Sequence, residues 1–168
     1  MLALLVALFD PLPEALTGAA RASDGDSLRL GSERVRLLGI DAPELDQTCS
    51  KAGGAQWPCG EAARTALSGL LKQGAISCAP DGRDRYGRIL AHCTADGRDL
   101  GRAIVEAGLA TADLEYKAVE VEARLAGRGI WQGTFDSPRD WRDRRGIMIE
   151  FDLVSWIRGW WSELWGRA

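Results

Sequence analysis

Histidine is almost absent from the chain, because His92 is the only one among 168 residues. A single imidazole excludes a metal site built on two histidines, and it leaves a Ser-His-Asp triad no choice of base. His92 falls in the apolar run at 89–93, which is typical of a strand. We therefore expect a structural role for His92 and look to other residue types for chemistry.

An excess of positive charge is also missing, since 21 Lys and Arg stand against 24 Asp and Glu, a net charge of −3. Proteins that coat nucleic acid depend on broad basic surfaces, so the composition excludes that class. The part of the chain from 21 to 146 is neutral, and the acidic excess lies towards the two ends. An anionic substrate therefore has to be held by a local arginine cluster and a metal.

The four cysteines lack CxxC spacing, which argues against a zinc site. Four cysteines allow three pairings. We expect Cys49–Cys59, which closes a glycine-rich loop with little core of its own. We also expect Cys78–Cys93, whose two members are equally far from a turn centred near residues 85 and 86. Disulfides indicate an oxidising compartment, and the alternative is four buried free thiols in a cytosolic protein.

A long apolar run is absent at the N-terminus, where the apolar residues 1–9 are too few to span a bilayer as a helix. They are similar to the core of a signal peptide, although no Lys or Arg precedes them. We read residues 1–15 as a partial signal or anchor followed by a linker. Together with the disulfides, this segment favours a periplasmic or secreted protein, and an anchor would also allow association with a membrane.

The C-terminal segment, residues 147–168, shows helical periodicity and contains four of the seven tryptophans. Its charged residues exclude a spanning helix. An amphipathic, tryptophan-rich helix suits contact with a membrane surface or with a partner's groove. The alternative is that this helix packs back onto the domain.

Between these ends, periodicity predicts one domain over 16–132 and a polar, arginine-rich linker over 133–146. Apolar alternation predicts strands, and 3.6-residue periodicity ending at glycine predicts helices. The segment at 46–58 is expected to be loop. The strands are expected at 16–23, 26–31, 34–40, 75–79 and 89–94, and the helices at 61–72, 100–107 and 116–126.

Acidic residues are concentrated at one end of the hairpin predicted from 26 to 40. The hairpin brings Asp26, at the start of its first strand, close to Asp41, just past the end of its second. Carboxylate oxygens suit calcium or magnesium, and the guanidinium of Arg36 could grip a phosphate oxygen. The alternative is simple turn chemistry, because Asp-Gly-Asp and Pro43 are both common at turns and strand ends.

A second polar segment, residues 81–88, combines three arginines, two aspartates, two glycines and a tyrosine. This is a phosphate-binding composition, with Arg85 and Tyr86 as substrate-binding candidates. A solvated hairpin turn is the alternative. Tyr116, at the start of the third helix, serves either as a packing residue or as a stacking surface for a base.

Three motifs in order, Asp24–Ser27, Arg36–Glu44 and Asp84–Arg88, resemble the staphylococcal nuclease (thermonuclease) family across 16–132. The cysteine loop and the segments at 129–131 and 135–142 are similar to its cysteine-containing, secreted or periplasmic bacterial branch. The resemblance implies an α+β, mainly β fold: a five-stranded oligonucleotide-binding (OB) Greek-key barrel with three helices. It implies Ca²⁺-dependent hydrolysis of DNA and RNA, single-stranded or breathing, that leaves 3′-phosphate ends, and we expect a monomer.

By resemblance, calcium would be bound directly by Asp26, Asp41 and the backbone carbonyl of Ala42, and through water by Asp24. The family usually has threonine in place of Ala42, so a hydroxyl near the metal is lost and calcium affinity is expected to be lower.

The resemblance also assigns the reacting groups. Glu44 would position or deprotonate the attacking water, while Arg36 and Arg88 would clamp the scissile phosphate. Tyr86 would bind a substrate phosphate and Tyr116 would line the base pocket. The competing hypothesis is a non-catalytic OB-fold nucleic-acid-binding module, but such modules lose the carboxylates or arginines that this chain retains.

Overall fold

The computed structural model describes residues 14–145. It divides into two compact units, Met1–Phe135 and Asp136–Ala168, which are described separately. The apolar segment at 1–13 and the predicted helix at 147–168 lie outside the described residues. Across 14–145, none of the helices has the length and apolar character needed to cross a membrane.

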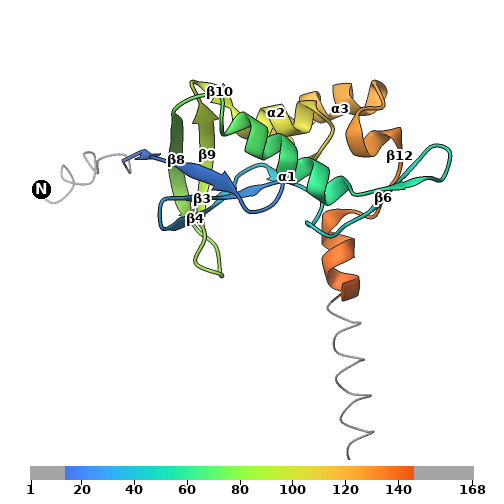
Figure 1. The fold of residues 1–168 in the computed structure, drawn as a ribbon, viewed down its shortest axis with the longest axis horizontal. Helices are drawn as coiled ribbons and strands as arrows, with labels where there is room; N and C mark the ends of the chain where they lie inside the picture. Colours follow the sequence, from blue (N-terminus) through green and yellow to red (C-terminus); the bar gives the residue numbers. More distant parts are fainter. Residues whose placement is uncertain (1–13, 146–168) are drawn as a thin grey trace, which may run out of the picture. The chain divides into compact units, whose positions relative to one another are not determined.

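The first unit is built on one curled mixed sheet, with the strand order β1-β8-β9-β4-β3-β2 and with β10 paired to β9 (Figure 1). All of its pairings are antiparallel except β4 with β9. The strands are β1 (Leu16–Thr17), β2 (Ala20–Ala22), β3 (Ser27–Leu30), β4 (Glu33–Leu37), β8 (Ile76–Arg83), β9 (Ile89–Ala95) and β10 (Arg98–Asp99).

The two strands of the β3–β4 hairpin follow the predicted alternation. Val35 and Leu37 of β4 are buried in the core, whereas Arg34 and Arg36 point to the opposite face. Two predicted strands are divided in the structure. The segment at 16–23 becomes β1, paired with β8, and β2, paired with β3. The segment at 34–40 ends at Leu37 and resumes as β5 (Ile40–Asp41), which pairs with β11 (Thr111–Ala112).

Three α-helices pack with the sheet, close to their predicted bounds: α1 (Cys59–Leu70), α2 (Leu100–Glu106) and α3 (Lys117–Leu125). Helix α1 contributes Ala63, Leu67 and Leu70 to the core. It packs against β2 and α2, while α2 packs against α3 and β9. Two short 3₁₀ turns, η2 (Leu114–Tyr116) and η3 (Gly129–Gln132), flank α3. The result is an α+β, OB-like fold, as predicted.

The prediction of a loop over 46–58 is wrong in part. The segment forms a hairpin of β6 (Cys49–Lys51) and β7 (Gln56–Trp57), and β6 also pairs with β12 (Gly133–Thr134). These strands are very short, and one partner lies about 80 residues away, so local periodicity carries no signal for them.

Both predicted disulfides are present. Cys49–Cys59 joins β6 to the start of α1 and packs with buried Ile130 in a small second core. Cys78–Cys93 joins directly paired residues of β8 and β9. The alternative of four free thiols is therefore wrong.

In the second unit, residues 138–145 are helical where the sequence predicts a linker. The Ser137 hydroxyl accepts a hydrogen bond from the Asp140 backbone N–H at 3.1 Å and donates to the Asp140 carboxylate at 2.7 Å. Proline at the first helical position after such a cap is a favoured helix start. The Ser-Pro pair was thus a readable signal for a helix.

Candidate active site

The site begins with two carboxylates joined by one guanidinium. Arg36 on β4 places Nη1 3.0 Å from Asp26 Oδ2, and its Nη2 lies 2.8 Å from Asp41 Oδ1. Asp26 precedes β3, and Asp41 ends β5, so the hairpin and the strand after it supply all three residues. The geometry collects two carboxylates and one phosphate-binding side chain at one end of the hairpin.

Asp26 is the buried member of the pair, with 4% of its surface exposed. The Ser27 hydroxyl donates to its Oδ1 at 2.9 Å, and the Ala42 backbone N–H donates to its Oδ2 at 3.2 Å. Burial raises the pKa of Asp26 to about 7, with Arg36 lowering it and Asp24 raising it. The neighbouring cation therefore compensates the buried charge only in part.

The donor set fits a hard cation. The two carboxylates supply oxygen ligands of the kind that calcium and magnesium prefer. A dication would also relieve the cost of ionising buried Asp26. Asp24 is engaged in the turn, since its Oδ1 accepts the Asp26 N–H at 3.0 Å. Within 14–145, no cluster of three or more His, Cys, Asp or Glu side chains is close enough to hold a metal, so a cation bound here would need backbone or water oxygens as further ligands.

Arg88 brings a second guanidinium close to Asp26, at the start of β3. Its Nη1 lies 3.5 Å from Ser27 Oγ, next to Asp26, and its Nε donates to Asp84 Oδ2 at 2.7 Å. Burial raises the pKa of Asp84, but hydrogen bonds from Arg88 and from the Tyr86 backbone lower it more, so the net pKa lies below its usual value. Asp84 therefore stays ionised and fixes the direction of Arg88.

The loop that carries Arg88 also presents an aromatic ring. The side chain of Tyr86 is 57% exposed, and the guanidinium carbons of Arg85 and Arg88 lie 4.8 and 5.7 Å from its ring centroid. Arg34 donates to the Tyr86 carbonyl oxygen at 2.8 Å and ties this loop to β4. A flat ring and two guanidiniums thus lie at the end of a loop that is tied to Arg34, two residues before Arg36 on β4.

Glu44 is held by a residue that the sequence did not single out. The Gln47 side chain, on a residue that is 0% exposed, accepts the Glu44 backbone N–H at 3.1 Å. The Gln47 N–H in turn donates to the Glu44 carbonyl oxygen at 2.8 Å. The Gln47 carbonyl accepts the Gly60 N–H at 3.2 Å, which anchors this turn to the start of α1.

Gly60 permits that close approach. An ideal Cβ built on Gly60 would collide with the carbonyl oxygen of Glu44, so a larger residue there would push the turn away from α1. The Cys49–Cys59 disulfide fixes the residue immediately before Gly60. The three-residue spacing of Glu44 and Gln47 was the one sequence signal for this arrangement, and it is too common to be specific.

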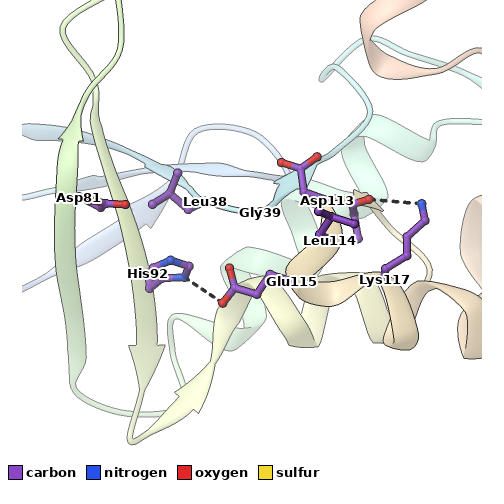
Figure 2. Close-up of a pocket in the computed structure, with 9 residues that line it drawn as sticks. Leu38, Gly39, Asp81, His92, Asp113, Leu114, Glu115 and Lys117 are labelled. Atoms are coloured by element: carbon purple, nitrogen blue, oxygen red, sulfur yellow. Dashed lines mark hydrogen bonds and ion pairs between the residues drawn. The ribbon is translucent and has the colours of Figure 1, made fainter.

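A pocket of about 710 Å³ opens between β8–β9 and the segment around η2 (Figure 2). Leu38 and His92 form one wall, and Leu114, Glu115 and Lys117 form the other. His92 Nδ1 lies 3.6 Å from Glu115 Oε1, so His92 lines a pocket rather than the core. Arg36 of β4 pairs with Leu90 of β9, and His92 follows Leu90 by two residues on that strand, so the pocket opens on the face of the sheet that carries Arg36.

Tyr116 lies beneath the pocket and does not line it, although its hydroxyl lies 3.4 Å from Nδ1 of pocket-lining His92. Tyr116 is 5% exposed, and its hydroxyl donates to Asp99 Oδ2 at 2.9 Å. Burial and the bond to Asp99 raise the pKa of Tyr116 well above its usual value. Leu114 of the η2 turn, by contrast, is 94% exposed. The ring of Tyr116 is therefore a packing residue, as one of the two interpretations from the sequence holds. Leu114, the exposed neighbour of Tyr116, has no flat ring on which a base could stack.

Comparisons with known proteins match this architecture. The family model of the staphylococcal nuclease homologues matches residues 34–133. The succinoglycan biosynthesis protein ExoI of Rhizobium meliloti is 37% identical over 126 residues, which cover 71% of this chain and 66% of that protein. An uncharacterized endonuclease of Haemophilus influenzae is 31% identical over 144 residues, covering 79% and 75%.

A plant relative extends the comparison to a longer protein. The probable staphylococcal-like nuclease CAN2 of Oryza sativa is 32% identical over 143 residues, covering 81% of this chain and 36% of that protein. The chain thus spans about two thirds of the Rhizobium protein and about a third of the rice protein. The matched region includes Arg36, Asp41, Glu44 and Arg88. The chain belongs to the staphylococcal nuclease family.

Proposed function

We propose that this chain is a calcium-dependent endonuclease that hydrolyses phosphodiesters of DNA and RNA and leaves 3′-phosphate ends. The observation that carries the proposal is the grip of Arg36 on both Asp26 and Asp41, with Arg88 reaching Ser27, the residue next to Asp26. Two carboxylates and two guanidiniums therefore lie together, which is what a cation site beside a phosphate clamp would need. Family membership supports nuclease activity, and the oxygen donors support calcium.

Calcium, held by Asp26, Asp41 and the Ala42 carbonyl and through water by Asp24, would draw negative charge from the phosphate. Arg36 and Arg88 donate to the non-bridging oxygens, where charge develops as the phosphate is attacked. Both guanidiniums are already oriented by carboxylates, so little side-chain ordering remains to be done when substrate binds.

Glu44 supplies the carboxylate that orients or deprotonates the attacking water. Its backbone is fixed on both sides by Gln47, which limits where that water can be held. Position matters here, because a displacement of about 1 Å in a reacting group can cost about 100-fold in rate.

The flanking groups select the substrate. Arg85 and Tyr86 contact the neighbouring phosphate, and the pocket beside Leu38 and His92, with Tyr116 beneath it, receives a base. A single unpaired strand has the splayed bases that such a pocket needs, so single-stranded or breathing DNA and RNA are the substrates. The protein acts as a monomer in this proposal.

The test is cleavage of single-stranded DNA by the full chain, with calcium or with excess chelator. Glu44→Ser and Arg88→Ala are each expected to lower the calcium-dependent rate by about 100-fold or more. Glu122→Ser and Arg102→Ala, which change the same residue types at exposed helical positions, serve as matched controls. Cleavage that survives both site variants, or that persists in chelator, would overturn the proposal.

The competing candidate is a non-catalytic OB-fold nucleic-acid-binding module. Retention of Asp26, Asp41, Glu44 and both arginines argues against it. Oligonucleotide binding without any cleavage would establish it. The two disulfides support a periplasmic or secreted location. Membrane-surface contact through residues 147–168, which lie outside the described residues, stays a prediction.

A further inference from the structure

Three arginines lie in a row across neighbouring strands. Arg21 of β2 is directly opposite Arg29 of β3, and Arg29 is directly opposite Arg34 of β4. Directly opposed residues project from the same face of a sheet, and all three side chains are exposed. We refer to Arg21, Arg29 and Arg34 as the arginine row.

The arginine row has almost no internal compensation. Like charges directly opposite one another destabilise a sheet. Within residues 14–145, no ion pair involves Arg21 or Arg29, and Arg34 donates to a neutral group, the Tyr86 carbonyl oxygen. Three adjacent cations without carboxylate partners, in a chain of net charge −3, are best explained by an anion that comes from outside.

The arginine row shares its face with the proposed active site. Arg34 and Arg36 are two residues apart on β4, as are Ser27 and Arg29 on β3, and Ser27 is directly opposite Arg36. Residues two apart on a strand share a face, at a spacing of about 7 Å. From Arg34 to Arg21, the row crosses about 10 Å of sheet at the usual strand spacing. Figure 1 shows β3 and β4 side by side.

Each end of the arginine row lies next to a further feature that suits nucleic-acid binding. At the Arg34 end lies the exposed ring of Tyr86. At the Arg21 end, a pocket of about 320 Å³ is also lined by Arg64 and Lys72, and its lining contains no acidic residue. A cationic track combined with an aromatic platform is the arrangement that binds single-stranded nucleic acid without sequence preference.

We propose that the arginine row binds the phosphate backbone of the single strand on one side of the bond that is cut. This proposal rests on the proposed function, because it extends the path of the same substrate. Guanidinium forks match phosphate oxygens, whereas the row offers no group placed to read a base edge, so the added affinity is independent of sequence. Short substrates that end at Arg36 and Arg88 do not reach the arginine row.

The test compares salt dependence of binding in a Glu44→Ser background, in calcium, by fluorescence anisotropy. The double variant Arg21→Gln/Arg29→Gln is titrated with a labelled single strand of about 15 nucleotides and with a trinucleotide. Loss of two phosphate contacts makes the negative slope of log K against log salt shallower by about 1.4 and lowers the affinity at 0.1 M salt by about 25-fold. The trinucleotide slope is expected to equal that of the parent protein. Arg98→Gln/Arg102→Gln, with the same change in charge at other exposed positions, keeps the parent slope.

Two results would overturn the proposal: a long-strand slope equal to the parent's in the double variant, or an equal decrease in the control variant. The second would show an effect of net charge alone. Failure of the proposed function is a separate observation, since it would appear as absent cleavage by the wild type and absent trinucleotide binding by the parent. The long-strand comparison alone decides the role of the arginine row.

Discussion

Replacing Gln47 by methionine tests how the turn at Glu44 supports catalysis. Methionine keeps the length of the side chain but removes the acceptor for the Glu44 N–H, a bond of 3.1 Å inside the protein. Loss of a buried hydrogen-bond partner costs about 1–3 kcal/mol of unfolding free energy. A freed turn also displaces Glu44, and we expect kcat to fall by about 10- to 100-fold, less than when the carboxylate itself is removed.

The assay is steady-state cleavage of single-stranded DNA in calcium at 20 °C, beside urea unfolding of the same preparations. Because Arg36 and Arg88 still hold the phosphate, KM is expected to stay within about twofold of wild type. Gln73→Met makes the same chemical change at an exposed position and serves as the control. A fully folded Gln47→Met protein with wild-type kcat, or a rise in KM alone, would refute the positioning role.

Three further predictions concern the frame around the site. Gly60→Ala should lower both thermal stability and the cleavage rate, because the added Cβ would collide with the Glu44 carbonyl. Gly69→Ala, in the same helix but with open space around it, should lower neither, and melting curves and cleavage rates of the two variants test this difference. Alanine at both cysteines of the β8–β9 disulfide, whose members are 15 residues apart, should remove about 3 kcal/mol of unfolding free energy in urea titrations; a loss near zero would contradict this. The pKa of Asp84 lies below its ordinary value of 3.8, so its ion pair with Arg88 stabilises the fold above about pH 4 and is lost as pH falls through the folded pKa. The stability difference between wild type and Asp84→Asn should therefore shrink below about pH 4, and a constant difference from pH 2 to 7 would oppose it.

The regular elements could be predicted because their residues alternate or repeat locally. Val35 and Leu37 mark the buried face of β4, and the apolar face of α1 ends at a glycine-containing turn. The β6–β7 hairpin could not be predicted, since it depends on pairing with β12 at the far end of the unit. The helix at 138–145 departs from the prediction because the polar, arginine-rich composition of this segment favours a linker, whereas the Ser137 cap indicates a helix start.

For the site, sequence motifs supplied the residue types, and the structure supplied their partners. The bridging of Asp26 and Asp41 by Arg36 requires the register of β3 and β4, which fixes the side chains that share a face. That register and the register of β2 with β3 together create the arginine row, which local periodicity does not reveal because its members come from three different strands. Gln47 falls in a segment that the sequence predicts as loop, and only its burial in the structure identifies it as a support for Glu44.

The most direct measurement of the central claim is mass spectrometry of the products that the full chain forms from a defined single-stranded oligonucleotide. Parallel reactions contain calcium or excess chelator. The account predicts fragments in calcium alone, each ending in a 3′-phosphate. Fragments that form equally in chelator, fragments that end in a 3′-hydroxyl, or intact oligonucleotide in calcium would contradict it.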